Sequence, residues 1–332
     1  MLRLLTRVSV FSLTALIFCQ ASLHAQVVQA PLNDGFVRTS SIEVTIDEML
    51  GIAQARDADA PLLGPGFPSL WIAEVQIKPL RLLRVNWKED GANRQEIVRY
   101  LMYRVILRDY TDLAGAEKPE LEAKLADIEN RPVNNRTEEL TRPLRLPKFL
   151  LQAEELDGTV VAAWPDVIHQ GIQQAIFERE LGRRGVQAKL LNSVEALQEI
   201  GEPVAADDPD TLDRALYGVA IWRNVDDRAD FFTVYMSGFS NAYRITQDDQ
   251  GNNVFEEKVI VQKFARPGDE FLQEEMEFRL IDTADLDGDE QAEMLPAWIY
   301  RRRAFDTSIT DFNQILRRIP TSSIPGETTV AQ

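Results

Sequence analysis

The chain has 332 residues, of which 45% are hydrophobic and 27% charged, so it is long enough for one large or two ordinary domains with a real core. Its 36 Lys and Arg against 53 Asp and Glu give a formal net charge of -17. A surface of this sign repels the phosphate backbone of nucleic acids, and its short basic clusters are poor ligands for anionic lipid headgroups. The composition therefore argues against both as partners.

The first 25 residues have the pattern of a signal peptide. Arg3 and Arg7 precede an apolar run, Val8 to Cys19, and Ala25 offers a small residue for cleavage. The run is shorter than the roughly 20 residues that span a bilayer. We therefore expect cleavage after Ala25, export to the periplasm or cell envelope of a bacterium, and no membrane span in the mature chain. The alternative is an uncleaved segment that anchors the chain in the inner membrane.

The cysteine and histidine content limits the chemistry of the mature chain. Cys19 is the only cysteine, and cleavage after Ala25 removes His24, which leaves His169. This inventory excludes thiolate nucleophiles, CxxC redox sites, zinc fingers and multi-histidine metal centres in the mature chain. Any metal there needs oxygen ligands.

The first half is predicted to be a β-rich domain over 70–184, preceded by a partly disordered lead segment over 26–69. Apolar and polar residues alternate over Trp71 to Lys78, as in a half-buried strand. Both faces of Ile97 to Leu107 are largely apolar, which favours an interior strand. A polar stretch over 112–142 is predicted to be an insertion with a short helix at 120–128.

The first half is predicted to end in a hairpin and a helix. Lys148 to Glu155 and Thr159 to Trp164 are separated by an Asp-Gly turn. An amphipathic helix is predicted at 166–182, with Pro165 at its first turn and Gly185 beyond its end. A second short helix is predicted from Ser193 to Ile200. The Pro-containing, acidic region over 185–212 is predicted to be a linker between domains.

The second half is predicted to be another β-rich domain, over 213–319. Five strand candidates are separated by Asp, Asn and Gly turns: Ala215 to Val225, Phe231 to Ile245, Val254 to Phe264, Met276 to Asp282 and Ala297 to Arg302. A capping helix over 308–318 and a disordered tail over 320–332 complete the prediction. The expected fold class is mainly β (α+β), with two antiparallel, possibly sandwich-like domains and a few short peripheral helices.

Four segments give the chain a resemblance to other proteins. They are WIAEVQIKP from Trp71, YLMYRV from Tyr100, FFTVYMSGFSNAYRI from Phe231 and KFARPGDEF from Lys263. Through them the chain resembles a group of secreted proteins of planctomycete bacteria. The resemblance implies export and a lineage-restricted envelope setting, and it brings no reaction, substrate or catalytic residue.

The sharpest local motif is the acidic loop over 285–293. Asp285, Asp287, Asp289 and Glu293 occupy positions from which oxygens can converge on calcium. The loop is similar to the DxDGDGxxD loops of extracellular repeats, but it has Glu290 where Gly is usual and Glu293 where Asp is usual. The alternative is a plain acidic turn between two strands. A calcium ion here would be structural, and no other cofactor is expected.

Other residues give weaker indications of chemistry. His169 could act as a general base with Asp166 or Glu178 as orienter, but no nucleophile motif accompanies it. Acid pairs such as Glu274/Glu275 and Asp207/Asp208 could serve a glycosidase, although 53 acids make such pairs unavoidable. The five tryptophans invite a sugar-platform interpretation, but their apolar strand settings favour a core role.

These observations predict a non-enzymatic structural or interaction module of the periplasm or cell envelope. Its partner would be a protein or an envelope polymer. The alternative is a secreted hydrolase that cleaves a polysaccharide or ester with carboxylates and holds structural calcium. A hydrolase needs a concave pocket into which carboxylates of perturbed pKa converge.

Overall fold

The computed structural model describes residues 35–40, 44–45, 48, 71–89, 92–108, 147–155, 158–182, 188–198, 204, 212–226, 229–248, 250–251, 253–266, 277–286 and 288–302. All belong to one structural unit, Leu32–Gln332. The predicted signal peptide, the helices at 120–128 and 308–318, and the tail at 320–332 lie outside the described residues, as does most of the lead segment. The described residues are mostly strand, so the mainly β fold class is confirmed.

The first sheet has the strand order β1-β2-β4-β8-β7, and β3 also pairs with β4. Its strands are β1 (Arg38–Thr39), β2 (Ile72–Ile77), β3 (Arg81–Glu89), β4 (Ala92–Arg108), β7 (Leu190–Leu191) and β8 (Leu216–Trp222). All pairings are antiparallel except that of β7 with β8.

Strand β4 lies in the interior of this sheet. It pairs with β3 and then β2 along one edge and with β8 along the other. Side chains on both of its faces are buried: Leu101 and Tyr103 point to one side, Tyr100 and Met102 to the other. The apolar run that starts at Ile97 therefore lies within a strand that is buried on both faces, as its composition predicts.

The second sheet has the strand order β10-β11-β9-β5-β6, with β12 and β15 also paired to β11. Its strands are β5 (Lys148–Glu154), β6 (Val160–Pro165), β9 (Phe231–Ser237), β10 (Tyr243–Gln247), β11 (Asn253–Ala265), β12 (Arg279–Leu280) and β15 (Ala297–Arg302). The β5–β6 hairpin is confirmed.

The single strand predicted over Phe231 to Ile245 is in fact two strands, β9 and β10. Gly238 breaks the run with a φ of 86°, in the left-handed region that glycine adopts without strain. The chain then crosses to the first sheet, where Ser240 bridges to Ile72 and the Phe239 carbonyl accepts a hydrogen bond from the Ala73 N–H. This crossing ties the two sheets together.

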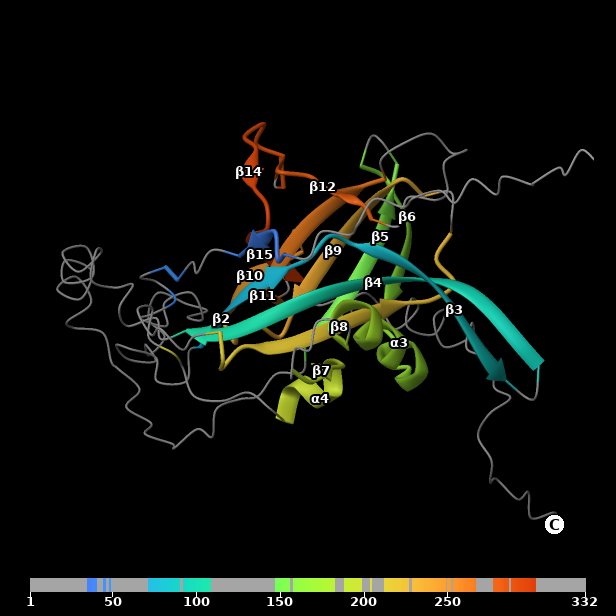
Figure 1. Cartoon of the computed structure of the whole chain (residues 1–332). Coiled ribbons are helices and arrows are strands. Elements are labelled where there is room, and N and C mark those ends of the chain that lie inside the picture. The colour runs from blue at the N-terminus through green and yellow to red at the C-terminus, as the bar shows by residue number, and fades with distance from the viewer. Residues whose placement is uncertain are drawn as a thin grey trace, which may run out of the picture. The chain divides into compact units, whose positions relative to one another are not determined.

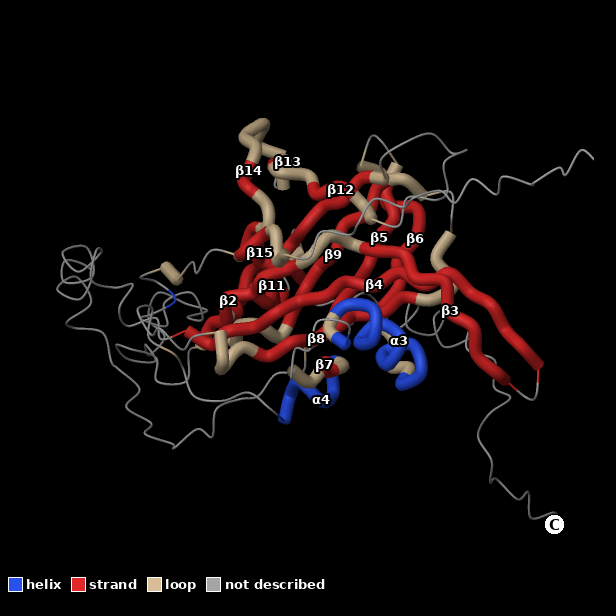
Figure 2. Tube along the Cα trace, viewed as in Figure 1, coloured by secondary structure: helices blue, strands red, loops and turns tan. Residues whose placement is uncertain are grey.

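The two sheets share one core, and a helix covers the far side of the first sheet (Figures 1 and 2). Inward side chains such as Leu101, Trp222 and Phe232 belong to the shared core. On the other face of the first sheet, Ile172 and Ile176 of helix α3 (Gln170–Glu180) pack on β4 and β8. Helix α4 (Ser193–Gln198) lies near β7 and β8.

Each sheet combines strands from both sides of residues 185–212. In the first sheet β8 pairs with β4, and in the second β9 pairs with β5. The two predicted β-rich segments thus build shared sheets rather than one sheet each. Inward-facing apolar side chains of β4, β5, β8 and β9 all belong to one hydrophobic core.

The helix predicted at 166–182 starts later than expected. Pro165 ends strand β6 instead of opening the helix, and α3 begins at Gln170 with His169 as its N-cap. The imidazole Nδ1 of His169 accepts a hydrogen bond from the Ile172 N–H at 3.2 Å. The cap satisfies one of the amide groups that a helix start leaves without an intrahelical partner.

Candidate functional site

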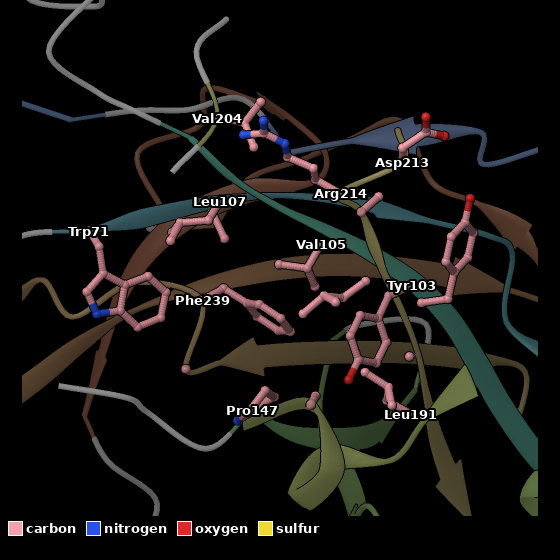
Figure 3. Close-up of a pocket in the computed structure, with 17 residues that line it drawn as sticks. Trp71, Tyr103, Val105, Leu107, Pro147, Leu191, Val204, Asp213, Arg214 and Phe239 are labelled. Atoms are coloured by element: carbon pink, nitrogen blue, oxygen red, sulfur yellow. The ribbon is translucent and has the colours of Figure 1, made fainter. Parts of the chain in front are cut away.

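A cavity of about 480 Å³ opens between the two sheets at one end of β2, β4 and β8 (Figure 3). Its wall is formed by inward-facing side chains of these strands, including Ala73, Val105 and Leu107, and by Phe239 from the crossing segment. Trp71, directly before β2, also lines it. A volume of this size falls in the range of about 300–1,000 Å³ typical of small-molecule sites.

The cavity is predominantly apolar. Asp213 and Arg214 are the charged residues among its 17 described lining residues. They precede β8, and in Figure 3 they lie well away from the phenolic oxygen of Tyr103. The chemistry of the wall therefore suits an apolar body, with polar contacts limited to a few positions.

Tyr103 occupies the floor of the cavity because its neighbour across the sheet is a glycine. Tyr103 of β4 pairs with Gly218 of β8. A Cβ added to Gly218 would lie 2.1 Å from Cζ of Tyr103, so the aromatic ring rests directly on the glycine backbone. The ring is also in contact with Phe149 and Phe239, at centroid distances of 4.8 and 5.6 Å. These contacts hold the side chain in place.

The hydroxyl of Tyr103 is buried and has no hydrogen-bond partner among the described residues. The residue is only 1% exposed, yet it lines the cavity. Burial raises the pKa of this phenol, and the negative charge of Asp166 raises it further, so the hydroxyl keeps its proton. An unpaired buried hydroxyl costs about 1–3 kcal/mol, which makes this position unusual for a residue with a purely structural role.

Tyr100, three residues earlier on β4, shows the ordinary arrangement. It lies on the opposite face of the strand, and its hydroxyl donates to Oε1 of Glu180 at 2.6 Å. The same carboxylate binds Lys78 at 2.9 Å and Arg81 at 2.7 Å. All of these polar atoms are satisfied inside the fold, which identifies the cluster of Tyr100, Glu180, Lys78 and Arg81 as structural.

Asp166 lies in the connection between β6 and α3. Its carboxylate accepts a hydrogen bond from the Phe149 N–H at 3.2 Å and another from the Ser193 hydroxyl. Burial raises the pKa of Asp166, and these two hydrogen bonds oppose that shift. The carboxylate fixes α4 and β5 to this connection. The structure thus gives His169 and Asp166, the predicted base and its orienter, clear roles in holding the fold.

Three of the predicted calcium residues, Asp285, Asp289 and Glu293, belong to a small hairpin of β13 (Thr283–Ala284) and β14 (Glu293–Met294). Asp285 accepts hydrogen bonds from the N–H groups of Gly288 and Glu290, at 2.6 and 3.1 Å. Glu293 accepts one from Leu286 at 3.0 Å.

Asp289, another of the predicted calcium ligands, accepts a hydrogen bond from the Gln291 N–H at 2.8 Å. Asp287 lies outside the described residues. Glu290 has a φ of 67°, in the left-handed region that glycine adopts without strain. Within the described residues, no group of three or more potential ligands is placed to hold a metal ion.

A second, smaller cavity of about 210 Å³ lies on the outer side of the second sheet. Its lining includes two carboxylates, Asp166 and Glu257, together with the basic residues Lys148, Arg301 and Arg302. The guanidinium of Arg301 lies 4.0 Å from the centroid of the Tyr235 ring. The acid pairs Glu274/Glu275 and Asp207/Asp208 lie outside the described residues.

The sequence favours a core role for the tryptophans, and the structure gives them different environments. Trp222 and Trp298 are buried in the core, whereas Trp71 lines the cavity between the sheets. The cavity itself was missed. One signal pointed to it: Gly218 interrupts an otherwise bulky strand, and such a glycine often marks a close approach of another group.

Comparisons with protein-family models, curated proteins and solved structures find no match to this chain. Within the described residues, no helix combines the length and apolar character needed to cross a membrane.

Proposed function

We propose that this chain is an exported, non-enzymatic interaction module of the periplasm or cell envelope, and that it binds an apolar small molecule between its two sheets. The observation that carries the proposal is the cavity beside Tyr103, which is of ligand size and lined mainly by apolar side chains. The signal-peptide pattern of residues 1–25 supports export.

The distribution of charge supports binding rather than catalysis as the role of this cavity. Glu180 and Asp166 are buried carboxylates with shifted pKa values, and both are engaged by neighbouring residues that hold the fold together. The cavity between the sheets receives one carboxylate, Asp213, from its described lining. Paired acid–base chemistry needs two.

The proposal is tested with N-phenyl-1-naphthylamine, a neutral apolar dye whose emission rises in an apolar site. We expect saturable binding to the purified chain and a higher melting temperature, because a ligand that binds only the native state stabilises it. Val105→Trp fills the cavity from its wall and should abolish both effects. Val161→Trp is the matched control, since Val161 is 53% exposed on β6 and away from the cavity. Equal binding by all three proteins, or by none, would contradict the proposal.

A second candidate function is a carboxylate-dependent hydrolase that uses the smaller cavity. The favouring observation is that Asp166, whose pKa is raised by burial, and Glu257 both line that cavity. Its volume of about 210 Å³ is below the range of most small-molecule sites, and Asp166 is already bonded to Phe149 and Ser193. Hydrolysis of polysaccharide or aryl ester substrates that is lost in both Asp166→Asn and Glu257→Gln would establish this function instead.

A further inference from the structure

The exposure of the lining residues shows which end of the cavity between the sheets meets solvent. Ala73, Tyr103 and Phe239 line the cavity, and each is at most 2% exposed. Asp213 and Arg214 line it as well, and both of these residues are exposed. The cavity therefore runs from a closed interior to a mouth beside the turn that precedes β8.

Charge is confined to this mouth. Asp213 and Arg214 are the charged residues among the described lining, whereas the lining from β2 and β4 is aliphatic or aromatic. A ligand that buries an apolar tail in the interior gains free energy in proportion to the apolar area removed from water. A charged head group at the other end of the same ligand stays at the mouth and keeps most of its hydration, so it avoids the cost of burial. The division of the lining therefore suits an amphiphile.

The two charged residues at the mouth differ in direction. In the view of Figure 3, the side chain of Arg214 extends toward Val204, another lining residue. The carboxylate of Asp213 points the other way, away from Val204. The guanidinium of Arg214, rather than the carboxylate of Asp213, is therefore the charge that a head group at the mouth meets.

A guanidinium favours one kind of head group. Its N–H donors form a planar fork that matches the two oxygens of a carboxylate, and such hydrogen bonds are stronger than those to a neutral acceptor. A hydroxyl head group would gain less from Arg214, and an ammonium group would be repelled by it. The chain has a net charge of -17, so a cation at the mouth distinguishes this opening from the surface as a whole.

We propose that the cavity holds a single-tailed amphiphile with a carboxylate head group, whose tail lies between the sheets and whose carboxylate pairs with Arg214 at the mouth. The inference rests on the proposed function, because it assigns the ligand class of the same cavity. It identifies Arg214 as the residue that determines specificity for the head group.

The test compares three amphiphiles with the same tail and different head-group charge: dodecanoate, dodecanol and dodecylammonium. Each displaces N-phenyl-1-naphthylamine from the purified full chain, and the loss of dye emission gives its affinity. We expect dodecanoate to bind about three- to tenfold more tightly than dodecanol, as one charged pair at an exposed site predicts, and dodecylammonium to bind most weakly. Dodecanoate should also bind roughly tenfold more tightly than decanoate, because it buries two more CH₂ groups.

Two variants assign the preference to Arg214. Arg214→Gln keeps much of the side-chain length and removes the charge, so the affinities for dodecanoate and dodecanol should become equal. Arg214→Glu should reverse the order and favour dodecylammonium. Arg84→Gln is the matched control, because it removes the same charge from an exposed residue of β3 that does not line the cavity, and it should keep the preference for dodecanoate. Circular dichroism and thermal melting establish that each variant is folded.

The outcomes also distinguish the inference from the function on which it rests. Equal affinity for the three amphiphiles in the original chain, or a preference for dodecanoate that persists in Arg214→Gln, would overturn the inference and leave the apolar binding function standing. A preference for dodecylammonium that is lost in Asp213→Asn would assign the head group to Asp213 and overturn the inference as well. Failure of the original chain to bind the dye at all would overturn the proposed function itself.

Discussion

Tyr103 and Gly218 face each other across strands β4 and β8, and the aromatic ring fills the space that a side chain on Gly218 would need. The distance of 2.1 Å from a Cβ at Gly218 to Cζ of Tyr103 leaves no room even for a methyl group. An aromatic ring that covers a glycine on a neighbouring strand is a known way of stabilising a sheet. Here the same packing also places Tyr103 in the lining of the cavity.

The first prediction concerns Gly218→Ala. Because Tyr103 is fully packed against Phe149 and Phe239, the added methyl group should destabilise the fold by about 1–3 kcal/mol in chemical denaturation. Gly171→Ala is the control, since its Cβ would meet only His169 at 3.4 Å and alanine favours the helix. In a double-mutant cycle, Tyr103→Ala should relieve much of the Gly218→Ala effect; strict additivity would show that the two residues are not coupled.

The second prediction concerns the buried charge cluster around Glu180. Its side chain and those of Lys78 and Arg81 are each 1% exposed, so Glu180→Gln leaves two buried cations without their main partner. We expect a loss of about 3–5 kcal/mol of unfolding free energy. Glu96→Gln is the control, because Glu96 pairs with Arg223 at a partly exposed site where about 0–1 kcal/mol is typical. If Glu180→Gln and Glu96→Gln lose the same unfolding free energy, the buried cluster contributes no more to stability than a surface ion pair.

This cluster also predicts a pH dependence. Burial alone would raise the pKa of Glu180, but the charge of Arg81 and the hydrogen bonds from Tyr100 and Lys78 lower it below its ordinary value of 4.5. The stabilisation is therefore complete above pH 4.5 and is lost as the pH falls through the folded-state pKa. The difference in unfolding free energy between the original chain and Glu180→Gln should narrow in acid.

The third prediction concerns Asp166, whose effect on stability should change with pH in the opposite direction to that of Glu180. Burial raises the pKa of Asp166 above its ordinary value of 3.8, so the folded state holds this proton more tightly than the unfolded state. The contribution of Asp166 to stability is thus greatest at low pH and declines as the pH rises from 3.8 through the folded-state pKa. Urea denaturation across this range should show that the unfolding free energy of Asp166→Asn rises relative to that of the original chain as the pH rises. If the difference in unfolding free energy between Asp166→Asn and the original chain does not change with pH, the argument is refuted.

Local patterns in the sequence predict the strands better than they predict their partners. Alternation over Trp71 to Lys78 locates β2, and the Asp-Gly turn locates the β5–β6 hairpin, because both depend on neighbouring residues. The pairing of Met102 with Val219 joins positions more than a hundred residues apart, and periodicity carries no information on that choice. The sequence therefore predicts a linker between two separate domains, whereas strands from the two halves pair with each other in both sheets.

The cavity could not be derived from the sequence for a related reason. Its wall combines β2, β4 and β8 with Leu191, Ala196 and the crossing segment, and each piece looks like an ordinary apolar stretch by itself. In the sequence, Tyr100 and Tyr103 belong to the same apolar run. Only the folded structure shows that the Tyr100 hydroxyl is paired with Glu180 and that the Tyr103 hydroxyl has no partner among the described residues.

The last prediction concerns the acidic loop that follows β13. Asp285 accepts hydrogen bonds from the N–H groups of Gly288 and Glu290, so Asp285→Ala should speed hydrogen exchange at these two amides. Asp285→Asn keeps one side-chain oxygen as an acceptor and should slow the exchange again. This result would show that a side-chain oxygen at position 285 organises the turn by accepting these hydrogen bonds.

Calorimetry of the metal-free chain with calcium tests whether the same loop also holds an ion. A structural calcium ion would give heat of binding and a higher melting temperature, and Asp285→Asn would lose both because it removes a charge from the ligand set. The hydrogen bonds already made by Asp285, Asp289 and Glu293 favour a turn that forms without the ion. We therefore expect the exchange rates at Gly288 and Glu290 to be the same with and without calcium; slower exchange only with calcium would assign the loop to the ion.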